Sequence, residues 1–180
     1  MSTGWMDRLG KIRRGKDRFF SESPQSPLPW PDRESFDGLN YYPVNEDLRF
    51  EVELHEYDEK AVVRVEATGG DQREMLCSGE FRFTVGGEER TLQAFRTDPS
   101  QERLFVPFRD ATAGTETYSK GRYLDLEPQV HRTAHGSWIL DFNEAYNPWC
   151  AYTEGYSCVI PPDENRLDLP IRAGEKRYRE

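Results

Sequence analysis

Long apolar runs are missing from this 180-residue sequence. None approaches the roughly 20 residues that a helix needs to cross a bilayer. The first residues, MSTGWMDRLGKIRRGKDRFF, also lack the continuous apolar core of a secretory signal peptide. The sequence therefore predicts a cytoplasmic protein with no transmembrane segment, and its length suits one domain with a short arm.

Cysteine and histidine are scarce, with three residues of each type. No CxxC pair is present, so the sequence carries no zinc signature. His131 and His135 have zinc-compatible spacing only on a helix, whereas Gly136 and its polar neighbours indicate a turn. We therefore expect no metal site, and the sequence names no cofactor.

Two catalytic or binding signatures are also absent. There is no GxSxG nucleophile elbow, which argues against the serine hydrolases that use one. No Gly-rich phosphate loop precedes a helix, which excludes nucleotide binding of the Rossmann or P-loop kind.

Lysine is scarce, and acidic residues outnumber basic ones, for a net charge of −9. Residues 1–20 hold six basic and two acidic side chains, a net of +4, so the other 160 residues carry −13. An acidic body repels phosphate backbones, so nucleic acid is not an expected partner. Acidity with few lysines also suits a high-salt cytoplasm and a halophilic source.

The N-terminal segment, residues 1–21, is predicted to be a basic amphipathic helix. Apolar side chains recur at helical spacing over residues 4–21, at Trp5, Leu9, Ile12, Phe19 and Phe20. Gly10 and Gly15 lower its helix propensity. The helix either packs its aromatic stripe on the domain or docks on a membrane or a partner.

Residues 22–47 contain five prolines and are predicted to be an extended strap. Residues 48–180 are predicted to be an antiparallel β domain, because apolar residues recur there with a period of two. Leu48 to Leu54 alternate in this way, and a turn at Asp58-Glu59 precedes the next alternating run. Gly86-Gly87 is typical of a tight hairpin.

Further strands are expected at 81–85, 91–95, 104–108, 123–126, 137–143 and 167–171. About eight short antiparallel strands with tight turns favour a mainly β fold, either a β-barrel or a β-sandwich.

The first candidate site is the stretch FRDATAGTETYSKGRY, residues 108–123. Asp110 and Thr112 can form turns with their own backbone, which makes a structured loop. Long loops on rigid β scaffolds also gather binding residues, here with Thr117 and Tyr118. Arg122 is suited to bind a carboxylate or phosphate, or to pair internally with Asp110 or Asp141.

The second candidate is the strand from Trp138 to Asn143. Trp138, Leu140 and Phe142 share one face, whereas Asp141 and Asn143 lie on the other. If that second face lines a concave site, the carboxylate and the amide form a polar pair for a ligand. If it does not, both residues simply cap the loop that follows.

The third candidate runs from Asn147 to Asn165 and contains Cys150, Tyr152 and Cys158. The two cysteines are eight positions apart. They are open to four interpretations: a disulfide, two buried structural thiols, a redox pair, or part of a metal site that would need further ligands.

These residues resemble a known family. The strings FVPFRDATAGTETYSKGRYL, LDFNEAYNPWCAY, CVIPPDENRL and AGEK are similar to the prokaryotic domain of unknown function 1684 family, from about Gly15 to Tyr178. The acidic composition resembles a haloarchaeal member. The resemblance implies no activity. The family motif falls largely on polar residues: Asp110, Thr112, Thr117, Tyr118, Arg122, Asp141, Asn143, Asn147, Cys150, Tyr152, Cys158, Asn165 and Glu175.

The leading hypothesis is a protein that binds a small polar molecule between the 110–122 loop and the 141–152 segment. Tyr118, Tyr146, Trp149 and Tyr152 would wall the pocket. The predicted ligand-binding residues are Asp110, Thr112, Thr117, Tyr118, Arg122, Asp141, Asn143, Asn147, Tyr152 and Asn165.

Two alternatives remain open. The first is an enzyme, a hydrolase or a thiol-dependent one, with Asp141 as general base and Cys150 or Tyr118 as nucleophile or acid. The second is an interaction protein that docks through the N-terminal helix. The sequence does not give the oligomeric state.

Overall fold

The computed structural model describes residues 3–179. Met1 and Ser2, in the predicted helical segment, and Glu180, in the predicted β domain, lie outside these residues. Seven strands follow the N-terminal helix α1 (Thr3–Glu22): β1 (Arg49–Val52), β2 (Leu54–Glu66), β3 (Gln72–Val85), β4 (Glu88–Arg96), β5 (Leu104–Phe108), β6 (Arg122–Leu126) and β7 (Trp138–Asp141). Two further helices are single turns, α2 (Trp30–Arg33) and α3 (Pro128–His131).

The strands form two antiparallel sheets. One has five strands in the order β2-β3-β4-β5-β6, and the other pairs β1 with β7. Residues 3–179 form no closed barrel in this arrangement. Both sheets contribute side chains to one hydrophobic core, in which Phe81, Val106, Leu140 and Phe142 are almost wholly buried. The predicted mainly β fold with an N-terminal helix is confirmed.

The hairpin between β3 and β4 follows the sequence prediction. Phe81 pairs with Leu92, and the strands turn at Gly86 and Gly87. Both glycines have positive φ angles, 62° and 79°, which side-chain-bearing residues adopt reluctantly.

Two details of the predicted strands were wrong. The expected turn at Asp58-Glu59 is not formed, because β2 continues through it with an irregular register between Glu56 and Ala61. The expected strand at 167–171 makes one isolated bridge, between Arg166 and Arg109, instead of a ladder.

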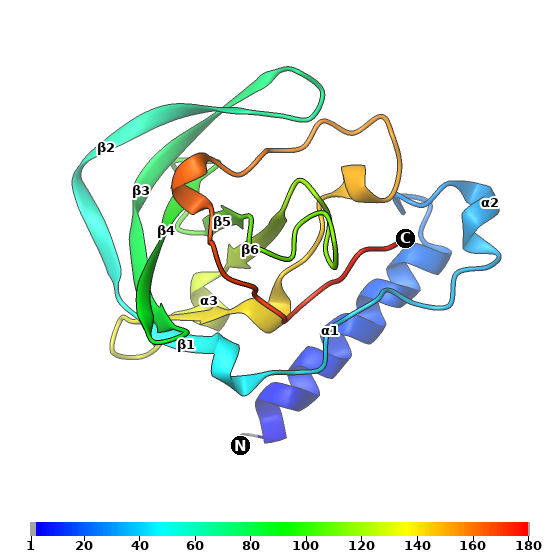
Figure 1. Ribbon diagram of the computed structural model, residues 1–180, viewed down its shortest axis with the longest axis horizontal. Coiled ribbons are helices and arrows are strands. Elements are labelled where there is room, and N and C mark those ends of the chain that lie inside the picture. The colour runs from blue at the N-terminus through cyan, green and yellow to red at the C-terminus, as the bar shows by residue number, and fades with distance from the viewer. Residues whose placement is uncertain (1–2, 180) are drawn as a thin grey trace.

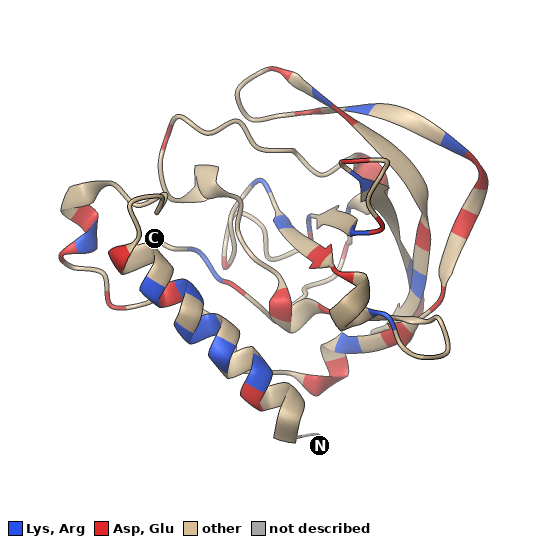
Figure 2. Ribbon diagram, turned by 180° about the vertical axis from the view of Figure 1, so that it is seen from behind, with Lys and Arg blue, Asp and Glu red and all other residues tan. Residues whose placement is uncertain are grey.

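Helix α1 lies across the molecule beside the C-terminal segment (Figure 1). Leu9 and Phe20 are buried beneath it, whereas Ile12, expected in the same stripe, is 44% exposed. Lys11, Arg14 and Arg18 of the helix are exposed, and Figure 2 marks its basic residues in blue along its length. No helix within residues 3–179 has the length and apolar character to cross a membrane.

The segment from 22 to 47 returns along α1 and contains the short helix α2. Leu28 is buried with Phe20 and Tyr152 in a small hydrophobic cluster. The Arg33 guanidinium donates hydrogen bonds to the backbone carbonyls of Ser23, Ser26 and Leu28, which folds the segment back on itself.

Candidate functional site

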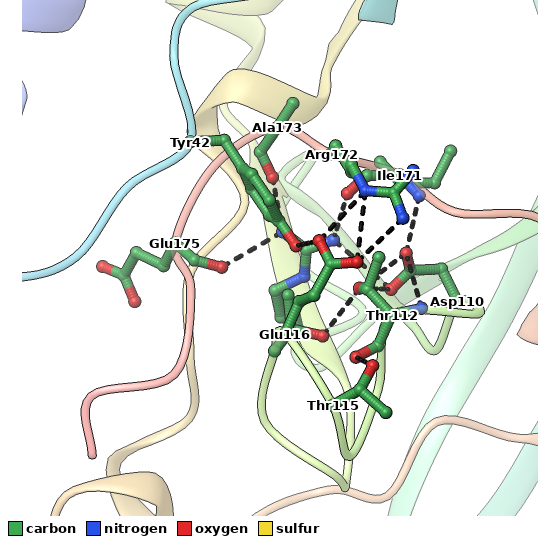
Figure 3. Close-up of polar contacts among 11 residues, drawn as sticks. Tyr42, Asp110, Thr112, Thr115, Glu116, Ile171, Arg172, Ala173 and Glu175 are labelled. Carbon is green, nitrogen blue, oxygen red and sulfur yellow. Dashed lines mark hydrogen bonds and ion pairs between the residues drawn. The ribbon is translucent and has the colours of Figure 1, made fainter. Parts of the chain in front are cut away.

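The 110–122 loop is held by a buried chain of polar side chains. The Thr112 hydroxyl donates to the Asp110 carboxylate at 2.8 Å and lies 2.8 Å from the Thr117 hydroxyl. The backbone N–H of Ile171 donates to the same carboxylate at 2.6 Å. Figure 3 shows Asp110, Thr112 and Ile171 gathered in this way. Asp110 and Thr112 therefore fix the loop to the C-terminal segment.

Arg122 is wholly buried at the centre of this polar cluster. Its guanidinium donates to the backbone carbonyls of Ile171 at 2.8 Å, of Glu175 at 3.2 Å and of Ala173. It also pairs with Asp110 at 3.3 Å. Burial lowers the pKa of Arg122, but an arginine stays charged inside a protein. Of the two internal partners predicted for Arg122, the structure selects Asp110.

These contacts replace strand pairing at Ile171, the last residue of the expected strand, whereas the backbone of Leu167 and Leu169 bonds to that of Arg109 and Ala111. The carbonyl of Ile171 and its N–H are satisfied by Arg122 and Asp110, which take the place of a neighbouring strand. No alternation of apolar residues signals such a substitution.

Glu175 joins the same cluster to α1. Its carboxylate pairs with Lys16 and accepts hydrogen bonds at 2.7 Å from the Asn147 N–H and from the Tyr152 hydroxyl. Burial, followed by the charge of Glu175, raises the pKa of Tyr152 well above its ordinary value. The Asn147 amide donates to the Lys176 carbonyl at 2.9 Å. Asn147 and Tyr152 thus hold the C-terminal segment in place.

Asp141 and Asn143 form a second, separate polar group. The Asp141 carboxylate accepts from the Asn143 amide at 2.8 Å and from the Trp5 indole N–H at 2.6 Å. The Asn143 amide exchanges two hydrogen bonds with the Asn45 backbone. Burial raises the pKa of Asp141. Because Trp5 and Lys16 are eleven residues apart in α1, Asp141 and Glu175 contact points of the helix separated by about 16 Å.

Asn165 lies apart from both of these polar groups. Its amide oxygen accepts from the Gln93 N–H at 2.8 Å, and its NH₂ donates to the carbonyls of Gln93 and Pro107. It therefore ties the Asp163–Asn165 turn to the neighbouring strand β4 and to the end of β5. The structure does not bring the ten predicted ligand-binding residues into one site, and most are satisfied by internal hydrogen bonds. Their role in binding stays a prediction.

A cavity of about 240 Å³ lies between the 110–122 loop and the turn at Trp149–Ala151. It is lined by Gly114, Tyr118, Ser119, Ala151, Arg177, Tyr178 and Arg179. The sequence reasoning missed Arg177 and Arg179, for which the basic run KRYR was an available signal.

Of the four aromatic residues predicted to wall a pocket, Tyr118 lines this cavity. The others have different partners. The Tyr146 hydroxyl donates to Asp125 at 2.5 Å, Trp149 stacks on Phe19, and Tyr152 bonds to Glu175.

Cys150 and Cys158 are free, half-buried thiols, not a disulfide. The Tyr118 hydroxyl lies 3.4 Å from the Cys150 sulfur. A hydrogen bond from the Cys158 thiol lowers the pKa of Cys150 to about 6, against the opposing effect of burial, and the same bond raises the pKa of Cys158. Burial raises the pKa of Tyr118, so its hydroxyl keeps its proton at neutral pH and can donate it to a hydrogen bond.

The histidines near this region have other roles or are exposed. His131 is buried, with its Nε2 atom 2.7 Å from the Glu144 carboxylate, and His135 is exposed. Within residues 3–179, no group of three or more His, Cys, Asp or Glu side chains is placed to hold a metal ion.

Fold and site together define a small, mainly β protein with buried polar clusters between its loops and its N-terminal helix. The chain belongs to the family described as a protein of unknown function, DUF1684, whose model matches residues 34–176. The predicted family is therefore confirmed.

Its fold is similar to the solution NMR structure of an uncharacterised protein from gene locus rrnAC0354 of Haloarcula marismortui. The two chains are 40% identical, the TM-score is 0.74, and the match covers 96% of this chain and 94% of that one. This similarity is consistent with a haloarchaeal member. No curated protein matches the chain.

Proposed function

We propose that the protein binds a small anionic molecule in the 240 Å³ cavity between the 110–122 loop and the Trp149–Ala151 turn. The observation that carries the proposal is the pair of arginines on its wall, Arg177 and Arg179. Guanidinium groups present a planar fork of donors that matches a carboxylate or a phosphate. The ligand class is therefore a small carboxylate or phosphate compound.

Local charge supports this ligand class. The chain carries a net charge of −9, whereas the wall of this cavity carries two arginines and no acidic residue. Arg177 bonds to the Thr115 carbonyl at 3.2 Å, and Arg179 pairs with Asp32 at 2.6 Å. These contacts orient both side chains while leaving further N–H groups of each guanidinium to meet an anion.

The buried polar residues support the proposal indirectly. Asp110, Thr112 and Arg122 fix the loop that carries Tyr118, and Glu175 fixes the segment that carries Arg177. A binding site is held to its working geometry by such supporting hydrogen bonds. In this proposal the predicted residues position the cavity wall, and Tyr118 is the one of them that meets the ligand.

The test is a thermal-shift screen of phosphate and of small mono- and dicarboxylates. A ligand at 100 times its Kd adds about 2.7 kcal/mol of stability, which corresponds to roughly 5–10 °C for a chain of this size. The double variant Arg177→Ala/Arg179→Ala is expected to lose the shift. The control Arg166→Ala, at an exposed arginine outside the cavity, is expected to keep it. A shift that survives in the double variant, or no shift with any anion, overturns the proposal.

A thiol-dependent enzyme is the second candidate, favoured by the contact between Tyr118 and Cys150. Asp141 does not fit the role of base for this thiol. Asp141 bonds to Trp5, whereas Trp149, next to Cys150, stacks on Phe19. Those two helix residues are 14 positions apart, or about 21 Å along α1. In an enzyme with Cys150 as the nucleophile, Tyr118 is therefore the remaining candidate for the acid.

An interaction through α1 is favoured by its exposed basic side, on which Lys11, Arg14 and Arg18 are spaced by three and four residues. Reversing these three charges to glutamate leaves the buried face intact. Recovery of the same partners from a cell extract by the wild type and by the triple variant would remove this candidate.

A further inference from the structure

A second cavity, of about 330 Å³, lies over one face of the five-stranded sheet. Its floor contains Ala61, Cys77 and Phe95, which are paired in a row across β2, β3 and β4. Residues directly opposite one another in antiparallel strands share a face of the sheet, so the three side chains point into the cavity together. Val63 and Val65 of β2 extend the same apolar floor. This cavity shares no lining residue with the one that contains Arg177 and Arg179.

An irregular part of β2 makes room for the cavity. The register of β2 against β3 shifts, so that residues 57–60 lie opposite the single residue Ser78. Extra residues of this kind bend a strand and redirect its side chains. Figure 1 shows β2 bowed away from β3 over the middle of its length. Tyr57 and Glu59, from the irregular part, line the cavity.

The segment that ends at Asn165 forms the opposite wall, where Pro162 lines the cavity. Hydrogen bonds hold this segment at both ends. The Ile160 N–H donates to the Glu66 carbonyl of β2 at 2.8 Å. The Asn165 amide exchanges two hydrogen bonds with the backbone of Gln93 in β4. The two walls are therefore fixed to the sheet by the fold, as in a preformed pocket.

Polar atoms on the cavity wall are mostly hydrogen-bond acceptors. The Tyr57 hydroxyl donates its proton to the Glu80 carboxylate at 2.8 Å, which leaves its oxygen to accept a bond. The Gln93 side chain provides an amide oxygen as well as an NH₂ group. Glu59 and Glu164 are exposed carboxylates on the same wall. The arrangement favours a ligand that donates a hydrogen bond.

The charges around the cavity disfavour an anion. Glu59 and Glu164 both contribute negative charge to the wall. Arg64, which also lines it, is paired with Glu74 at 3.1 Å. Burial raises the pKa of Cys77, so the floor carries no charge at neutral pH. The cavity is thus apolar at its floor and acidic at its opening, in contrast to the arginine-lined cavity.

We propose that this second cavity binds a small neutral aromatic molecule that carries a hydrogen-bond donor, such as a phenol or an indole. Its volume is at the lower end of the range for small-molecule pockets, which suits a ligand of one or two rings. The buried ring of Phe95 offers stacked or edge contacts to such a ligand. This inference goes beyond anion binding and does not depend on it.

The test uses the whole folded chain, labelled for NMR, with indole as the probe. Titration with indole is expected to give saturable shifts of the backbone amides of residues 61–65 and 93–95, which line the cavity. The amides of residues 114–119, beside the arginine-lined cavity, are expected to stay in place. Benzoate, which has a ring and a negative charge, is expected to leave residues 61–65 and 93–95 unshifted. No saturable shift with indole, or an equal affinity for benzoate, overturns the proposal.

A pair of neighbouring substitutions tests the position of the ligand. Ala61→Trp places a large side chain in the cavity from an exposed position, so it should block indole without disturbing the core. Val62→Trp is the matched control, because Val62 is 63% exposed, is the next residue of β2 and does not line the cavity. Ala61→Trp is expected to abolish the shifts with indole, and Val62→Trp to keep the wild-type Kd. Wild-type affinity in a folded Ala61→Trp variant would place indole elsewhere and overturn the proposal.

A change in the ligand tests the hydrogen bond. N-methylindole keeps the rings but has no N–H, so it is expected to bind about fivefold more weakly, the equivalent of one net hydrogen bond. Equal affinities for indole and N-methylindole would contradict the assignment of a donor. The variant Arg177→Ala/Arg179→Ala is expected to bind indole like the wild type. Failure here and failure of the proposed anion site are therefore distinguishable.

Discussion

Two polar regions meet at the 110–122 loop and differ in how their side chains are satisfied. Around Arg122 and Asp110, the charged groups are almost wholly buried and bonded to backbone carbonyls and N–H groups. Around Cys150 and Cys158, the thiols are half-buried, and the contact of the Cys150 sulfur is with the Tyr118 hydroxyl, at 3.4 Å. Both regions contain residues of the family motif. The comparison shows that residues of one polar motif can differ in burial, some wholly buried within the fold and others partly exposed.

The two regions should also differ in how much stability a substitution removes. Removing one partner of a buried charged pair leaves the other without compensation, at a cost of about 3–5 kcal/mol. A half-buried hydrogen bond contributes about 1 kcal/mol. Substitutions in the Arg122 region should therefore act on stability, and substitutions near Cys150 on reactivity.

Arg122→Met is expected to have the largest effect. It removes the cation that pairs with the buried Asp110 carboxylate and the guanidinium donor of the Ile171 and Ala173 carbonyls, so the free energy of unfolding should fall by about 3–5 kcal/mol. Urea denaturation measures the loss. Arg166→Ala, at an exposed site, is the control and should change stability by less than about 0.5 kcal/mol. If both variants lowered stability by similarly small amounts, the Arg122 region would not have the stabilising role assigned to it.

Gly174→Ala tests the backbone of the same region. Gly174 has a φ of 76°, and a methyl group there would approach the carbonyl oxygens of Phe142 and Ala145 to 2.7 Å. Gly87 has nearly the same φ, 79°, with open space around it. Gly87→Ala should therefore cost about 1 kcal/mol, from the backbone conformation alone. Gly174→Ala should cost at least about 2 kcal/mol more in the same denaturation experiment. Equal losses would show that the chain relaxes around the methyl group.

Tyr118→Phe tests the second region, around Cys150. The hydroxyl of Tyr118 bonds to the half-buried sulfur of Cys150, so its removal should lower the free energy of unfolding by no more than about 1 kcal/mol. Thermal denaturation gives this value. A loss as large as that of Arg122→Met would place Tyr118 among the residues that hold the fold.

The smallest expected effect is a pH dependence at Glu116, on the exposed edge of the Arg122 region. Hydrogen bonds from Arg172 and then from Tyr42 lower the pKa of Glu116 to about 2 from its ordinary 4.5. Its stabilising contribution is therefore complete above pH 4.5 and is lost as the pH falls toward 2. Because the Glu116 side chain is 35% exposed, solvent screening limits the contribution to about 1 kcal/mol or less. In Glu116→Gln, stability should fall less steeply between pH 4.5 and 2, and an unchanged slope would contradict this account.

Local patterns were enough to predict the helix α1, the hairpin at Gly86-Gly87 and most strands. They were not enough where contacts between residues far apart in the sequence determine the structure. The pairing of β1 with β7 joins residues about ninety positions apart, and no local feature announces it. The alternating residues at 167–171 predicted a strand, but at Ile171 a buried arginine and aspartate take the backbone hydrogen bonds that a neighbouring strand would make.

The same reason limits what could be said of the site. The sequence predicted a pocket between the 110–122 loop and the 141–152 segment, and the structure has a cavity between that loop and the Trp149–Ala151 turn, whose role in binding stays a prediction. It did not separate polar residues that point inward, such as Asn165, from those that line a cavity, such as Arg177. Side-chain direction in an irregular loop follows no period, unlike that in a strand.

The contacts of residues 171–178 have a consequence for synthesis of the chain. Glu175 pairs with Lys16 of α1, the Lys176 N–H donates to Asn40, and Tyr178 lies against Phe36. A ribosome makes the helix and the strap first and these partners last, and domains in general complete their packing only after their sequence has emerged. The contacts of Lys16, Asn40 and Phe36 with residues 175–178 therefore form only after that segment has left the exit tunnel, whereas Leu28 and Phe36 can cover Phe20 earlier.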